Sequence, residues 1–136
     1  MRVLIDTNVV LDFLQEREPF AENAARLFER VDAGEIEGFI AATTITNIYY
    51  IVRKAAGAIV AQDAITQILR DLNICVVDRN VLEQAIALNF RDFEDAVQYV
   101  CGVVYSVDAI VTRDASGFVG GDIPVMSPEE FDTIDT

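Results

Sequence analysis

Residues 3–10 read Val3-Leu4-Ile5-Asp6-Thr7-Asn8-Val9-Val10, and this stretch decides the fold. A run of apolar and largely β-branched residues ends abruptly in an acid, a hydroxyl and an amide, and then the apolar pattern resumes. A composition of this kind favours a short buried strand. We therefore expect a strand over 2–5 that delivers Asp6 to a strand-to-helix turn, followed by a helix over 8–14.

The rest of the chain alternates between strand-like and helix-like apolar patterns. Strands are expected at 37–41, 74–77, 109–112 and 123–126. Helices are expected at 20–33, 43–54, 60–72 and 80–89, and an acid-rich helix entry at 91–96 continues as a helix over 96–105. A loop is expected at 116–121, and a last helix starts at Ser127-Pro128. Thr43, Thr44 and Thr46 are candidate caps of the third helix. The alternation predicts an α/β fold, a parallel sheet covered by helices on both faces, in one domain over 1–136.

The composition excludes several kinds of chemistry. The chain has no histidine, which excludes a Ser-His-Asp or Cys-His triad built within it and histidine-based zinc sites. Cys75 and Cys101 lie in apolar contexts and are expected to be buried thiols. The formal net charge of −13 repels a nucleic-acid backbone, and it is compatible with an acidic cation site or a basic protein partner. No apolar run approaches the roughly 20 residues of a membrane span, so we expect a soluble, cytoplasmic protein without a membrane partner.

Three acids that are far apart in the sequence are expected to meet at one edge of the sheet. Asp6 follows the first strand and Asp114 follows the fourth, and open parallel sheets bind ligands at the carboxyl ends of their strands. Asp95 lies at the start of the helix before the fourth strand, and a right-handed crossover places that start at the same edge. Each acid also has a simpler explanation, because Asp6 suits a helix cap, Asp95 suits a helix dipole and Asp114 suits a turn.

Clustered carboxylates raise one another's pKa and destabilise the fold unless a cation joins them. Oxygen ligands of this type suit Mg²⁺ or Mn²⁺. Such an ion lowers the pKa of a bound water and stabilises charge on a phosphoryl group in transfer. Because the chain has no histidine, metal-activated water is the most economical hydrolytic mechanism open to it.

Four stretches resemble, in order, the motifs of PIN domains. They are 4–12 (LIDTNVVLD), 43–50 (TTITNIYY), 92–96 (DFEDA) and 110–114 (IVTRD), and the final IPVMSPEEF is also similar to the ending of that family. The resemblance implies a three-layer α/β/α sandwich around a parallel sheet of about five strands. It also implies a metal-dependent ribonuclease directed at single-stranded RNA, in a family that includes VapC-type toxins of toxin–antitoxin pairs.

By this resemblance Asp6, Asp95 and Asp114 would be the catalytic and metal-binding acids. Asp92 would be a supporting acid on the same helical face as Asp95, since residues three apart are neighbours on a helix. Further supporting residues would come from within the motifs: Thr7, Asn8 and Thr112.

The sequence departs from the family pattern at Asn47, where the second motif usually supplies a glutamate. An amide oxygen still ligates Mg²⁺ but brings no negative charge, so binding is weaker or Glu94 or Asp92 substitutes. The alternative is that Asn47 is a helix-face residue with no role. Basic residues for an RNA path are few, and the candidates include Arg53, Lys54 and Arg113. The pair Arg53-Lys54 also suits a solvated helix end.

The leading hypothesis is a Mg²⁺- or Mn²⁺-dependent endoribonuclease of PIN type, the toxin of a pair with a cognate antitoxin as its partner. A second hypothesis is a catalytically weak or inert PIN fold that binds RNA or protein, which Asn47 and the acidic balance favour. A third is a phosphatase-like hydrolase with Asp6 as nucleophile. The apolar face Ile48-Tyr49-Ile51-Val52 is a candidate homodimer surface, and the alternative is that this face is core.

Overall fold

A parallel sheet of five strands forms the centre of the computed structural model, which describes residues 1–118 and 121–134. The strands are β1 (Arg2–Ile5), β2 (Glu37–Ala41), β3 (Asn73–Cys75), β4 (Ala109–Val111) and β5 (Val125–Met126). They lie in the order β3-β2-β1-β4-β5, and each neighbouring pair is parallel. The predicted α/β fold is therefore confirmed, including the number of strands.

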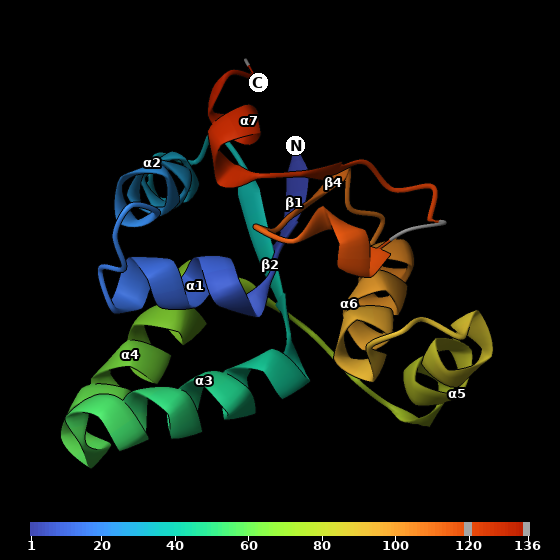
Figure 1. The fold of residues 1–136 in the computed structure, drawn as a ribbon, viewed down its shortest axis with the longest axis horizontal. Helices are drawn as coiled ribbons and strands as arrows, with labels where there is room; N and C mark the ends of the chain where they lie inside the picture. The colour runs from blue at the N-terminus through green and yellow to red at the C-terminus, as the bar shows by residue number, and fades with distance from the viewer. Residues whose placement is uncertain (119–120, 135–136) are drawn as a thin grey trace.

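Helices cover both faces of this sheet, as Figure 1 shows. On one side lie α1 (Thr7–Leu14), α2 (Ala21–Asp32), α3 (Ala42–Ala56) and α4 (Ala58–Asp71), and on the other lie α5 (Arg79–Leu88) and α6 (Phe93–Val104). A 3₁₀ helix, η1 (Ala115–Phe118), follows β4, and α7 (Pro128–Asp132) contacts α2. The arrangement is a three-layer α/β/α sandwich.

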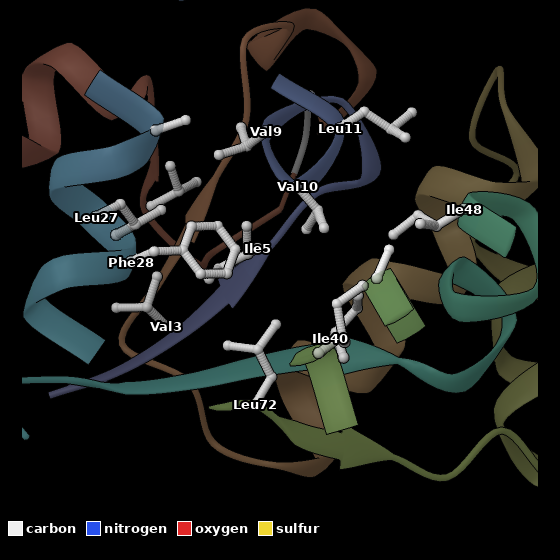
Figure 2. Close-up of a cluster of buried hydrophobic side chains, with 14 of the residues drawn as sticks. Val3, Ile5, Val9, Val10, Leu11, Leu27, Phe28, Ile40, Ile48 and Leu72 are labelled. Carbon is white, nitrogen blue, oxygen red and sulfur yellow. The ribbon is translucent and has the colours of Figure 1, made fainter. Parts of the chain in front are cut away.

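The residues of β1 explain why the core has two layers. Successive side chains of a strand point to opposite faces of the sheet. Val3 and Ile5 belong to the cluster under α1–α4, whereas Leu4 belongs to the cluster under α5 and α6, and all three are fully buried. Figure 2 shows the first cluster, in which Val3 and Ile5 lie close to Leu27 and Phe28 of α2. Burying each such side chain contributes about 1.5–3 kcal/mol.

Helix α3 and the loop after β4 differ from the sequence predictions. The helix starts at Ala42 as soon as β2 ends, with the extended residue Ala41 as its cap, so the three threonines lie inside it. Ile48 and Val52 are buried in the core, which makes the predicted dimer face partly wrong, because only Ile51 of that set is exposed. The predicted loop at 116–121 overlaps η1, and its residues 119–120 lie outside the described part of the chain.

Polar residues gather at the edge formed by the carboxyl ends of the strands. Asp6 directly follows β1, and Thr112 directly follows β4. Since α6 leads into β4 through a crossover, the first turn of α6 lies at this edge as well. Cys75 and Cys101 are buried free thiols that form no disulfide bond, as predicted. Within the described ranges, no helix is both long and apolar enough to cross a bilayer.

Candidate active site

Asp6 is a buried carboxylate, 7% exposed, whose two oxygens both accept hydrogen bonds. It caps α1, because Oδ1 accepts from the Thr7 backbone N–H at 2.7 Å. Oδ1 also accepts from Gln98 Nε2 at 2.9 Å, and Oδ2 accepts from the Thr112 hydroxyl at 2.6 Å. The simpler explanation of Asp6 as a cap is therefore correct, but two further elements also orient this carboxylate.

Thr112 connects the loop after β4 to the start of α1. Its hydroxyl donates to Asp6 and accepts from the Asp114 N–H at 3.1 Å and from Asn8 Nδ2 at 3.4 Å. Asn8 Oδ1 in turn accepts from the Arg113 N–H at 3.3 Å. Thr112 is almost fully buried and lies at the centre of one network that joins side chains of the first and fourth sequence motifs.

Asp95 lies in the first turn of α6, and Gln98 connects it to Asp6. Asp92 caps this helix, and its Oδ1 accepts from the Asp95 N–H at 3.2 Å. One turn further, Gln98 Nε2 donates to Asp6 Oδ1 at 2.9 Å and to Asp95 Oδ1 at 3.5 Å. Gln98 is fully buried, and its Oε1 has no hydrogen-bond partner among the described residues. The two carboxylates set the direction of the amide, because the reversed amide would place its oxygen against two anions.

Burial raises the pKa of Asp95 to about 7, and neighbouring charges add to the effect. In order of size, these charges are those of Asp6, Asp92, Glu94 and Asp114. Four acids from three separate parts of the chain therefore act on the Asp95 carboxyl group, which is partly protonated near neutral pH. Perturbation of this kind, by burial and by specific charges together, is frequent at functional sites.

Asp114 lies on the exposed side of this cluster. Its Oδ1 accepts from the Ser116 backbone N–H at 3.2 Å and from the Ser116 hydroxyl, so Asp114 also shapes the turn into η1. Gly117 of η1 lies directly against the Asp95 carboxylate, and a Cβ at position 117 would overlap Asp95 Oδ2. The missing side chain therefore lets η1 approach Asp95 closely.

Asn47 and Glu94 are placed differently with respect to the acids. Asn47 is exposed on α3, and within the described chain no hydrogen bond joins it to Asp6 or Asp95. Glu94 Oε1 accepts from the Thr7 hydroxyl at 3.0 Å, immediately beside Asp6. Of the two acids considered as substitutes for the second-motif glutamate, Glu94 is thus the one that reaches the start of α1.

The three basic candidates also differ in their surroundings. Arg53 and Lys54 are exposed near the end of α3, where cations suit the helix dipole. Arg113 instead donates from Nε and Nη2 to the two Asp12 oxygens, at 2.6 and 3.3 Å, and its Cζ lies 3.9 Å from the centroid of the Phe20 ring. Asp12 is only 1% exposed, so its buried charge requires this partner.

Mg²⁺ or Mn²⁺ fits the donor set as a cation held by a pair of carboxylates. Across 1–118 and 121–134, no three acidic or thiol side chains lie close enough to enclose an ion. Magnesium is usually held by one or two carboxylates together with several waters, however. Asp6 and Asp95 supply two carboxylates on either side of one amide.

The sequence predictions missed Gln98 and Asp12. Each is a polar residue within an apolar helical run, and each is almost fully buried. A buried polar group needs a partner, so this interruption was the available signal. The partners could not be named from the local pattern, because Asp6 lies 92 residues from Gln98 and Arg113 lies 101 residues from Asp12.

Comparison with known proteins shows a similarity along nearly the whole chain. The sequence is 29% identical over 135 residues to Ribonuclease VapC1 from Aquifex aeolicus (strain VF5), which covers 96% of this chain and 92% of that protein. Solved structures share the fold. A chain of a toxin–antitoxin complex from Klebsiella pneumoniae matches with a TM-score of 0.70 and 20% identity, over 93% of this chain and 97% of that one.

VapC20 from Mycobacterium tuberculosis, a sarcin–ricin loop cleaving toxin, matches with a TM-score of 0.72 and 14% identity, over 88% of this chain and 95% of that one. At such low identity the structural likeness concerns the fold alone. The sequence evidence is broader, because residues 2–116 match the model of the PIN domain. That range includes all four motifs and both ends of the Asp6–Asp95 connection, and the chain accordingly belongs to the PIN domain family.

Proposed function

We propose that this protein is a divalent-metal-dependent endoribonuclease that hydrolyses phosphodiester bonds of single-stranded RNA, as the toxin of a toxin–antitoxin pair. The observation that carries the proposal is the connection of Asp6 and Asp95 through one buried amide at the carboxyl edge of the sheet. Similarity to Ribonuclease VapC1 supports the nuclease chemistry. The fold shared with a chain of a toxin–antitoxin complex is consistent with the toxin role.

In this proposal Asp6 and Asp95 hold Mg²⁺ or Mn²⁺ at the acidic edge, and Asp114 adds its negative charge from the exposed side of the cluster. When bound, the metal lowers the pKa of water and stabilises the charge that develops on the phosphoryl group. Thr112 and Gln98 keep the Asp6 carboxylate in one orientation, so that little reorganisation is needed when the substrate arrives.

Three residues play positioning roles in the same proposal. Asp92 fixes the first turn of α6 as its cap, and thereby the position of the Asp95 backbone. Glu94, anchored on the Thr7 hydroxyl, supplies the negative charge that the second motif lacks. Asn8 holds the loop after β4 against α1, because its Nδ2 donates a hydrogen bond to Thr112 and its Oδ1 accepts one from the Arg113 N–H.

A second candidate function is a catalytically weak or inert PIN domain that binds RNA or protein. The observation in its favour is Asn47, an uncharged and exposed residue at the place where the family usually has a glutamate. An inert domain and a nuclease both bind RNA, so RNA binding alone does not distinguish the two functions. Cleavage of the RNA strand and binding of the metal ion distinguish them.

Cleavage of single-stranded RNA by the purified protein is expected to require Mn²⁺ or Mg²⁺ and to stop when the metal is chelated. The same ions should raise the Tm, because a ligand that binds only the folded state stabilises it, by about 2.7 kcal/mol at 100 times its Kd. Gel analysis of a labelled RNA and thermal denaturation measure the two effects. Sodium chloride at equal ionic strength is the control, since it screens charges without coordinating them. If the ions change neither the RNA nor the Tm, the inert domain is the better description.

An acidic groove supports a basic antitoxin segment as the protein partner. The groove has a volume of about 640 Å³ and lies between α2 and α4. Its apolar lining includes Phe13 and Phe28, whose rings stack with centroids 4.1 Å apart. The charged lining consists of one cation, Arg70, and four acids: Glu29, Asp32, Asp63 and Asp71. A groove that combines two stacked aromatic rings with four acids suits an amphipathic helix that carries Lys or Arg beside its apolar face.

The double variant Asp32→Lys, Asp63→Lys is expected to weaken capture of the antitoxin at least about tenfold, because like charges across an interface cost several kcal/mol. The probe is a basic amphipathic peptide with Lys or Arg beside its apolar face, titrated against the purified protein as a stand-in for the antitoxin segment. Glu83→Lys on α5, on the opposite side of the sheet, is the matched control. An unchanged affinity of the double variant would place the antitoxin elsewhere.

We further propose that the protein forms a homodimer and acts in the cytoplasm. Tyr50, Ile51, Ile59 and Val60 are exposed large apolar residues where α3 and α4 join, and Tyr50 alone is 60% exposed. Large exposed apolar side chains that gather on one surface mark interaction sites, so these four residues support self-association through α3 and α4.

A further inference from the structure

A cavity of about 260 Å³ lies beside the candidate active site and has no assigned role. Its lining combines apolar and polar side chains: Phe20, Asn23, Arg113, Ser127, Pro128 and Glu129. Arg113 immediately precedes Asp114 at the end of β4, and Ser127 directly follows β5. The cavity therefore opens on the same carboxyl edge of the sheet as Asp6, at the side where α2 and α7 begin.

Arg113 reaches this cavity with part of its hydrogen-bonding capacity free. A guanidinium has five N–H donors, and Asp12 occupies the side formed by Nε and Nη2. The fork formed by Nη1 and the second Nη2 proton has no partner among the described residues. Phe20 covers one face of the guanidinium and Asp12 is buried, so this fork is held in a fixed direction.

We propose that this cavity binds a guanine base of the single-stranded RNA, with Arg113 and Glu129 as the residues that recognise it. The proposal rests on the proposed nuclease function and names a specificity site for it. An arginine fork matches the adjacent O6 and N7 acceptors of guanine. The Glu129 carboxylate accepts from the N–H groups on the neighbouring edge of the same base.

A phosphate group fits this cavity less well than a base. Asp12 already compensates the charge of Arg113, and Glu129 adds a negative charge to the lining. An anion would therefore meet no net attraction here. A base carries both acceptors and donors without a charge. Among the four bases only guanine has two adjacent acceptors, O6 and N7, next to two adjacent donor groups, N1–H and N2–H₂.

Direct binding of short oligoribonucleotides tests the proposal. Fluorescence anisotropy in the presence of EDTA compares an oligouridylate, the same strand with one central guanosine, and the same strand with 7-deazaguanosine, which lacks only the N7 acceptor. The wild-type protein is expected to bind the guanosine strand about tenfold more tightly than either of the others, the usual effect of a bidentate base contact. The three strands carry the same number of phosphates, so a phosphate contact gives three equal affinities.

Two variants assign the effect to the cavity. Arg113→Lys keeps the charge but loses the fork, and its Tm must be measured because Asp12 depends on this partner. Glu129→Gln changes an exposed residue and keeps the fold. Both variants are expected to reduce the preference for guanosine to about twofold or less, whereas Glu83→Gln on α5 should keep it in full. A preference that survives in Glu129→Gln and in folded Arg113→Lys would overturn the assignment.

The outcomes separate this proposal from the nuclease proposal. A preference for guanosine in a protein that cleaves no RNA would support the cavity and reject the nuclease. Cleavage without any preference among the three strands would reject the cavity and leave the nuclease. Equal affinities in a protein that does not cleave would reject both.

Discussion

Replacement of Asp6 by asparagine is expected to lower the rate of RNA cleavage by about a thousandfold, since a loss of about 4 kcal/mol of transition-state stabilisation has that effect. The substitution keeps the size of the side chain and removes one of the two charges that the proposed metal site needs. It also places an amide N–H₂ where Oδ2 accepts from the Thr112 hydroxyl. Because that hydroxyl already accepts from Asp114 and Asn8, it cannot simply reverse its role, and the orientation of residue 6 is lost as well.

The fold should survive this substitution. The Thr7 N–H can still bond to the remaining oxygen, so the cap of α1 is kept. A buried charge beside Asp95 disappears at the same time. Circular dichroism and thermal denaturation establish that the variant is folded, and labelled single-stranded RNA with Mn²⁺ measures cleavage. Asp122→Asn is the matched control, because it makes the same chemical change at an exposed position. Equal cleavage by Asp6→Asn and the wild type would reject a hydrolytic role for the site.

The strands that the sequence predicted best are those in the middle of the sheet. The bounds of β1 and β2 were predicted correctly, since both strands have a neighbour on each side and are buried as continuous apolar runs. The strands β3 and β5 lie at the two edges. Each pairs on one side only, and its paired segment is shorter than the predicted strand: 74–77 becomes Asn73–Cys75, and 123–126 becomes Val125–Met126.

The candidate site was predictable where local sequence determines position. Asp6 and Asp114 follow strands, and Asp95 starts a helix, so the fold alone brings them to one edge. What the side chains contact there was not predictable. Arg113 was predicted to bind RNA because it is one of the few basic residues, and only the folded structure shows its partner Asp12. Propensity also misplaced the threonine caps, because the end of β2 sets the start of α3.

Replacement of Asp95 by asparagine is expected to stabilise the metal-free protein at neutral pH while it abolishes cleavage. The pKa of this carboxyl rises from 3.8 to about 7 on folding, chiefly because of burial and then because of the Asp6 charge. Between these two pH values the folded state holds a proton that the unfolded state has lost. The free energy of unfolding therefore falls as the pH rises from about 4 to about 7, and the penalty is complete above that range.

The size of this penalty is moderate. The carboxyl is only partly buried, so solvent screens part of the interaction, and a difference of about 1–2 kcal/mol at pH 8 is a reasonable expectation. For a chain of this length that corresponds to an increase in Tm of about 3–8 °C. Thermal denaturation of the wild type and of Asp95→Asn across this pH range measures it as a difference, in which the titration of the acids far from position 95 cancels. Asp122→Asn should follow the wild type throughout.

Stability and activity should therefore move in opposite directions at this one position. Replacing a residue that only supports the fold destabilises the protein. Replacement of Asp92 should have this effect, because it removes the hydrogen bond by which Asp92 caps α6 at the Asp95 N–H. A residue kept for binding a cation lowers stability until the cation arrives. Addition of Mn²⁺ should accordingly raise the Tm of the wild type and leave that of Asp95→Asn almost unchanged. The difference in Tm between the two proteins then becomes smaller or changes sign. If Asp95→Asn is less stable than the wild type at pH 8 without metal, the charge at position 95 serves the fold, and its proposed role as a metal ligand fails.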